Sequence, residues 1–156
     1  MTMEQILAEL RTYEGLLELA PLPGSGHPEI SWGDHFFYYA PDGLVPRNRQ
    51  PYATIVTKDY PDDAASDLDA EDCWRLNIHV GTALFTELLG YPPAQSGGAG
   101  VDHSTTDAFL PHPLYGPYGW VCIVNPGSAT IPRALEALRV AHQNDRRRVE
   151  RQASSS

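Results

Sequence analysis

Histidine is the residue type of this chain that is best suited to acid–base chemistry, because its side chain titrates near neutral pH and also binds metals. The sequence contains six histidines, and none of them stands at a spacing typical of metal ligands. We therefore predict neither a metal nor another cofactor. His79 is the leading candidate for proton transfer, because it shares a short alternating segment with Arg75 and Asn77.

Further candidates could act with His79 if the fold brings them close. His35 begins a predicted strand directly after Asp34, so that either side chain could exchange a proton with His79. His112 lies between two prolines. Lys58 is the only lysine, and in a pocket it could anchor an anion or, with a lowered pKa, act as a base. For each of them, a structural role or surface exposure is the competing interpretation.

Aromatic residues could form the walls of a ligand pocket, since such pockets are mostly apolar with a few polar groups. Core packing accounts for at least half of these aromatic residues. No nucleophile elbow, zinc signature, dinucleotide fingerprint or kinase motif assigns a reaction. The candidates for pocket walls are Trp32, Tyr38, Tyr39, Tyr115, Tyr118 and Trp120. As ligand-binding residues we predict Asn77, Tyr38, His112, Tyr115 and Trp32.

The segment 74–81 is the strand that positions the leading candidates. Apolar and polar residues alternate along it, and successive side chains of a strand point to opposite faces of the sheet. Leu76, Ile78 and Val80 should therefore face the core. The opposite face, which is either solvated or lines a cavity, carries Arg75, Asn77 and His79.

The other expected elements surround this strand. Strands cluster between two terminal helices, which predicts an α+β fold with a single antiparallel sheet of about five strands and both helices packed on one face. We expect one domain over residues 1–151 and a disordered tail over 152–156. The predicted helices cover 2–19, 82–89 and 130–151, and the predicted strands cover 35–40, 52–58, 74–81 and 119–124, with an edge strand interrupted by a break over 107–116.

Composition excludes several classes of protein. The net charge of −9 makes nucleic acid an unlikely partner, and no apolar stretch is long enough to cross a membrane. The two cysteines form no disulfide framework, and the N-terminus does not resemble a secretory signal, so the expected location is the cytoplasm. A sheet with one open face could also pair face to face in a homodimer.

Several local patterns resemble those of known families. Trp32-Gly33 before an aromatic strand, Arg75–Gly81 before a short helix and Gly119–Val121 before the last helix are similar to the MmcQ/YjbR-like domains. This resemblance implies a CyaY-like fold, with a curved antiparallel sheet under two helices, and suggests DNA binding. The chain departs from that pattern in an acidic segment at 59–72, predicted to be a solvated loop, and in a glycine-rich loop at 92–106, predicted to be mobile.

A closer resemblance is to a group of uncharacterised actinobacterial proteins that share a domain of unknown function. It is carried by the segments His35–Tyr39, Arg75–Gly81 and Leu110–Gly116. This resemblance implies the fold and the source, and it implies no activity.

Three hypotheses on function follow. The first is a small domain that binds a small molecule or a protein partner without chemistry of its own. The second is an enzyme of secondary metabolism in which His79 transfers protons together with His35, Asp34 or Lys58. The third is DNA binding through Arg146–Arg151, which the net charge of −9 disfavours.

Overall fold

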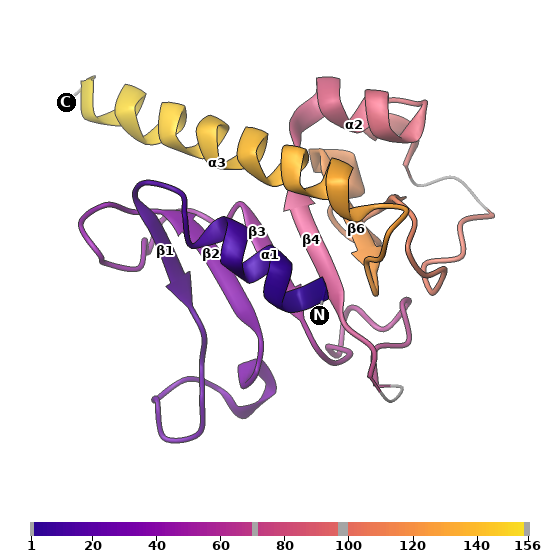
Figure 1. The fold of residues 1–156 in the computed structure, drawn as a ribbon, viewed down its shortest axis with the longest axis horizontal. Coiled ribbons are helices and arrows are strands. Elements are labelled where there is room, and N and C mark those ends of the chain that lie inside the picture. Colours follow the sequence, from indigo (N-terminus) through magenta and orange to yellow (C-terminus); the bar gives the residue numbers. More distant parts are fainter. Residues whose placement is uncertain (1, 70–71, 97–99, 155–156) are drawn as a thin grey trace.

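The computed structural model describes residues 2–69, 72–96 and 100–154, and within them it forms a single open antiparallel sheet (Figure 1). Its strands are β1 (Leu16–Leu19), β2 (His35–Tyr39), β3 (Ala53–Val56), β4 (Arg75–His79), β5 (Leu110–Pro111) and β6 (Trp120–Val124). They lie in the order β1-β2-β3-β4-β6-β5. The predicted α+β class is confirmed, while the expected number of about five strands is corrected to six.

The helices α1 (Thr2–Leu10) and α3 (Ile131–Ser154) lie across one face of this sheet, and α2 (Gly81–Leu89) directly follows β4 (Figure 1). Short 3-10 turns are formed by residues 29–31, 93–95 and 116–118. The helices bury the apolar side of the sheet in one core. Its fully buried members include Ile6, Leu10, Phe37, Ile55, Leu76, Ile78, Phe85, Ile123 and Leu138.

The first helix is much shorter than predicted. It ends at Leu10, and the leucines at 16–19, which we assigned to the same helix, form the edge strand β1. The chain reverses at Gly15, whose φ of +76° suits glycine, and whose carbonyl accepts the Ala40 N–H at 2.8 Å. A Cβ atom at Gly15 would also collide with the ring of Tyr39. Pairing with β2 therefore overrides the helical spacing of the leucines.

The alternation predicted for the segment 74–81 is confirmed in β4. Leu76 and Ile78 are fully buried under the helices, and Val80 follows at 2% exposure. Residues that pair across an antiparallel sheet share a face. The opposite face of β4 therefore carries Arg75, Asn77 and His79, which pair with Val56, Thr54 and Trp120 of the neighbouring strands.

The later helices agree more closely with the sequence. The short helix α2 ends at Leu89, close to the predicted span 82–89, and Gly90 caps it in a left-handed conformation with a φ of +83°. The long helix α3 continues to Ser154, so residues 152–154, which we expected in a disordered tail, are helical. Nothing in that stretch stops a helix, and Arg146 pairs with Glu150 one turn later. Residues 155–156 lie outside the described part of the chain.

The N-terminus of α3 is capped by a residue from a distant loop. The Asp107 carboxylate accepts the N–H groups of Gly127, Ala129 and Thr130 at 2.7–3.1 Å. The Thr130 hydroxyl also donates to Asp107, at 2.6 Å. These bonds hold the pKa of Asp107 below its usual value, with the Thr130 hydroxyl contributing most.

Replacing Asp107 with glycine should lower the free energy of unfolding by about 1–3 kcal/mol, because several N–H groups at the end of α3 lose their acceptor. Glycine adds no backbone strain here, because Asp107 has a φ of +52°. Asp107→Asn keeps one acceptor oxygen and should show a smaller loss. Urea denaturation measures both, and an Asp107→Gly variant as stable as the parent would contradict this capping role.

Candidate ligand-binding site

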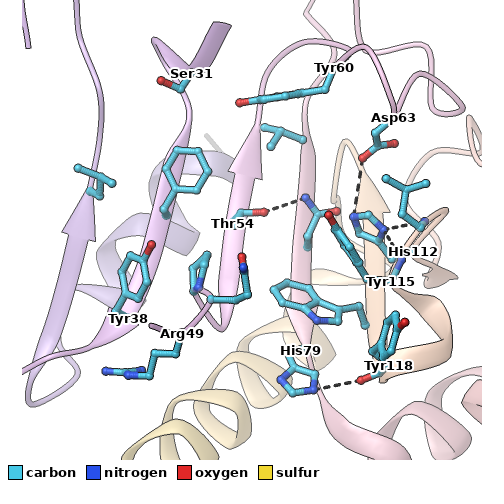
Figure 2. A pocket seen from close by; sticks show the side chains of 18 of the residues that line it. Ser31, Tyr38, Arg49, Thr54, Tyr60, Asp63, His79, His112, Tyr115 and Tyr118 are labelled. Carbon is cyan, nitrogen blue, oxygen red and sulfur yellow. Dashed lines mark hydrogen bonds and ion pairs between the residues drawn. The ribbon is translucent and has the colours of Figure 1, made fainter. Parts of the chain in front are cut away.

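The face of the sheet opposite to α1 and α3 is hollowed into a pocket of about 830 Å³. We call it the open-face pocket (Figure 2). Side chains of β2, β3, β4 and β6 form its floor, while loops and the C-terminal half of α3 form its walls. Of the two alternatives that the sequence left open for the polar face of β4, the structure therefore has the lined cavity. Its floor and walls include Tyr38, Thr54, Asn77, His79, Tyr115 and Trp120.

A buried arginine organises the polar part of the floor. Arg75 is 1% exposed, and its two terminal nitrogens both bond the carboxylate of Asp63. The same guanidinium donates to the Asn77 amide oxygen at 2.7 Å and to the Ser66 hydroxyl at 3.0 Å. Because these partners fix the side chains of the floor, Arg75 shapes the pocket while most of its own N–H groups are occupied.

Asp63 corrects the prediction that residues 59–72 form a solvated loop. Its side chain is only 12% exposed, and it lies over the open face against Arg75. Burial alone would raise the pKa of Asp63, but the hydrogen bonds and charge of Arg75 outweigh it and hold that pKa below its usual value. Residues 70–71 of this segment, and residues 97–99 of the glycine-rich loop, lie outside the described residues.

His112 lines the pocket in a fixed protonation state. Its Nδ1 accepts the N–H groups of Leu114 and Tyr115, both at 3.1 Å, so its proton is on Nε2. Nε2 lies 3.8 Å from the Asp63 carboxylate. Burial and the nearby charge of Arg75 lower the pKa of His112 to about 3, so the ring is neutral at neutral pH. His112 therefore holds the wall segment that carries Tyr115.

His79 has one nitrogen available to a ligand. Its Nε2 lies 3.1 Å from the Tyr118 carbonyl, which can only accept, so Nε2 carries the proton. The ring stacks on Trp120, with 5.4 Å between the centroids. Burial, and next the charge of Arg148, lower the pKa of His79. Its Nδ1 is thus an unprotonated acceptor, with no hydrogen-bond partner among the described residues.

Two hydroxyl groups of the floor, those of Tyr38 and Thr54, can also form hydrogen bonds with a ligand. Tyr38 is 7% exposed, and its hydroxyl points into the pocket without a partner among the described side chains (Figure 2). Burial raises the pKa of Tyr38 against the opposing charge of Arg49, so the phenol keeps its proton. Thr54 Oγ1 accepts the Asn77 amide at 2.9 Å, which leaves the Thr54 proton for a ligand. The floor can thus both donate and accept hydrogen bonds.

The other candidates for proton transfer do not meet His79. His35 pairs with Ile55 on the helix-covered face, so the sheet separates it from His79, and its Nδ1 bonds Glu18 at 2.8 Å. Asp34 is fully buried and bonds Lys58 at 3.0 Å. Asp34 and Lys58 form a closed network at the ends of β2 and β3, and they do not line the pocket.

Most of the predicted ligand-binding residues do line the pocket. Tyr38, Asn77, His112 and Tyr115 are among its walls and floor. Trp32 is not: its indole N–H donates to the His27 carbonyl at 3.2 Å, and its own carbonyl accepts from Lys58. Of the remaining aromatic candidates, Tyr118 and Trp120 line the pocket, while Tyr39 packs on the ring of His142.

Sequence reasoning missed several charged residues of the pocket, among them Arg49, Asp63, Asp145 and Arg148. They come from two loops and the last helix, and no local pattern joins them. One signal was present for Asp63. Arg75 lies on a strand among buried neighbours, and a buried arginine is stable only when an acid pairs with its charge. The densest run of acids in the chain, over 59–72, stands directly before β4. The other three meet only through the tertiary structure.

Among residues 2–69, 72–96 and 100–154, no group of three or more histidine, cysteine, aspartate or glutamate side chains is placed to hold a metal ion. Within the same ranges, no helix has the length and apolar character needed to cross a bilayer.

Comparison with known proteins places residues 1–154 under one family model, described as a family of unknown function (DUF6194). No curated protein and no solved structure matches the chain.

Proposed function

The chain belongs to DUF6194, a family of unknown function, and we propose that its open-face pocket binds a small organic molecule with a planar apolar body. The observation that carries this proposal is the pocket itself. Helices cover one face of the sheet, whereas the other face leaves a space of about 830 Å³ between aromatic walls. Pockets of ~300–1,000 Å³ with apolar walls and a few fixed polar groups are typical of small-molecule sites.

Binding without chemistry is favoured over catalysis. His79 offers an unprotonated nitrogen, but neither His35 nor the pair Asp34 and Lys58 lies beside it as a second acid–base group. His112 is occupied by backbone N–H groups. The partners that the sequence suggested for proton transfer with His79 are therefore not beside it.

Two broader expectations remain proposals. We propose that the fold is related to the CyaY-like arrangement of the MmcQ/YjbR-like domains, since an antiparallel sheet lies under two helices in both. The DNA binding that this relation suggests fits poorly with the net charge of −9. A protein partner, or a second copy of the chain, could also cover the open face, where Leu114, Tyr115 and Tyr118 are exposed at its rim.

Titration of the labelled protein with planar probes, followed by amide NMR spectra, tests the binding proposal. Indole, indoleacetate, indoleacetamide and benzoate are the probes. We expect saturable shifts at floor residues such as Thr54, Asn77 and His79. Tyr115→Ala should weaken binding about fivefold, because an aromatic contact contributes ~1 kcal/mol.

Leu44→Ala is the matched control, because Leu44 is 69% exposed and does not line the open-face pocket. It should leave the affinities unchanged. If no probe moves the pocket signals at millimolar concentration, the proposal is wrong. Shifts that instead depend on protein concentration and spread over the rim would point to self-association.

A further inference from the structure

Charged groups are distributed unevenly along the open-face pocket. Asp62 and Asp63 lie at one end, where Asp63 is neutralised by Arg75. Arg49 lies near Tyr38 at the opposite end, away from Asp63 (Figure 2). If the pocket binds a small molecule, as proposed above, this uneven distribution would select the charge of that ligand. The assignment of its charge rests on the proposed function.

At the end of the pocket away from Asp63, two arginines form ion pairs with the same acid. The side chain of Asp145 in α3 is 3% exposed. Its carboxylate forms one ion pair with Arg49 at 2.6 Å and another with Arg148 at 3.3 Å. It also accepts the backbone N–H of Tyr39 at 2.9 Å. One negative charge therefore balances only one of two guanidinium groups, and the cluster Arg49–Asp145–Arg148 carries a net charge of +1. In a chain with a net charge of −9, this is a local reversal.

The excess positive charge lies on guanidinium groups that still have N–H donors available for a ligand. Arg49 uses its terminal nitrogens on Asp145 and on the Tyr39 carbonyl. Arg148 donates to Asp145 at 3.3 Å, and its side chain is 39% exposed. A guanidinium has five N–H donors in a planar fork that matches the two oxygens of a carboxylate. Arg148 can therefore bind such a group without leaving Asp145.

The field of these arginines acts inside the pocket. The charge of Arg148 lowers the pKa of His79 by more than the charge of Asp145 raises it, and the charge of Arg49 acts to lower the pKa of Tyr38. His79 and Tyr38 line the floor from different strands. His79 is itself neutral, so it does not add a competing cation. The positive potential therefore reaches the space that a ligand would occupy.

We propose that the ligand of the open-face pocket is a planar organic acid, whose carboxylate is bound by Arg148 with support from Arg49. Its apolar body lies over Tyr38 and Trp120, and its far end lies toward Tyr60 and Asp63. The carboxylate of such a ligand distinguishes it from neutral aromatic compounds of the same shape. Asp62 and Asp63 at the other end of the pocket would repel that carboxylate if the ligand bound the other way round.

Pairs of probes that differ only in charge test this assignment. Indoleacetate is compared with indoleacetamide, and benzoate with benzamide, by calorimetric titration at low salt. We expect each acid to bind about tenfold more tightly than its amide, or better, since hydrogen bonds to charged groups are the stronger kind. In Arg148→Gln the ratio of the two affinities should fall to near one.

Arg147→Gln is the matched control. It removes the same charge one residue away, where the exposed Arg147 side chain contacts Asn144 and does not line the pocket. This variant should keep the preference for acids. If it loses the preference as fully as Arg148→Gln, the effect comes from overall charge and the assignment is wrong.

The remaining outcomes separate the two proposals. Equal affinity of the unmodified protein for acid and amide would contradict the carboxylate site and leave the binding pocket standing. No affinity for any of the four probes would contradict the pocket proposal, and the carboxylate site with it.

Discussion

Arg75→Met is expected to lower the free energy of unfolding by about 3–5 kcal/mol, the usual cost of removing one partner from a buried ion pair. Arg75 is 1% exposed, and its charge is matched by Asp63, whose side chain is 12% exposed. Methionine fills a similar volume but gives no hydrogen bond to Asp63, Asn77 or Ser66. Urea denaturation at neutral pH measures the loss.

A second substitution distinguishes an unpaired charge from lost packing. In the double variant Arg75→Met, Asp63→Leu, no carboxylate is left against the open face without its partner. Such apolar replacements of buried pairs are often close to neutral, so the double variant should recover most of the stability. A double variant as unstable as Arg75→Met alone would show that the loss comes from packing, and the interpretation of the ion pair would then be wrong.

Stability is expected to fall as the pH drops below about 6.5, and His112 should dominate this effect. In the folded protein the pKa of His112 is lowered from 6.5 to about 3 by burial, with the charge of Arg75 adding to it. The unfolded chain therefore takes up a proton first as the solution is acidified. The stabilisation is complete above the unfolded pKa and is lost progressively as the pH falls from about 6.5 toward 3.

The size of this effect follows from the same shift. One pKa unit corresponds to ~1.4 kcal/mol, so the shift from 6.5 to about 3 is on the order of 5 kcal/mol between the ends of the window. The pKa values of His79, His103 and His142 are also lowered, mainly by burial, and they act in the same direction. Asp63 and Glu18 have lowered pKa values too, and they lose their contributions at more acidic pH.

His112→Asn provides the control, because an asparagine oxygen can accept the N–H groups that Nδ1 accepts, and asparagine does not titrate. Denaturation curves of both proteins should be compared from neutral pH downward. The variant should have a distinctly flatter profile between about pH 6.5 and pH 4. Parallel profiles would assign the acid sensitivity to other residues.

The sequence alone determined the elements whose pattern is local. The alternation over 74–81 separated Leu76 and Ile78 from Arg75, Asn77 and His79, because neighbouring side chains of a strand must point to opposite faces. Gly90 ended α2 because it readily adopts a left-handed conformation. The pattern failed at 16–19, where leucines fit a helix as well as a strand and pairing with β2 made the choice.

The site required the tertiary structure. Asp34, His35 and Lys58 are suited to proton transfer by type, yet the pairing of β2 with β3 put His35 on the far face, and Asp34 was bound by Lys58. Arg49 and Arg148 stand 99 positions apart and meet only because both reach Asp145. Residue type sets which chemistry a side chain can do. Strand register and loop packing set which side chains meet, because these depend on contacts between distant segments that no local pattern records.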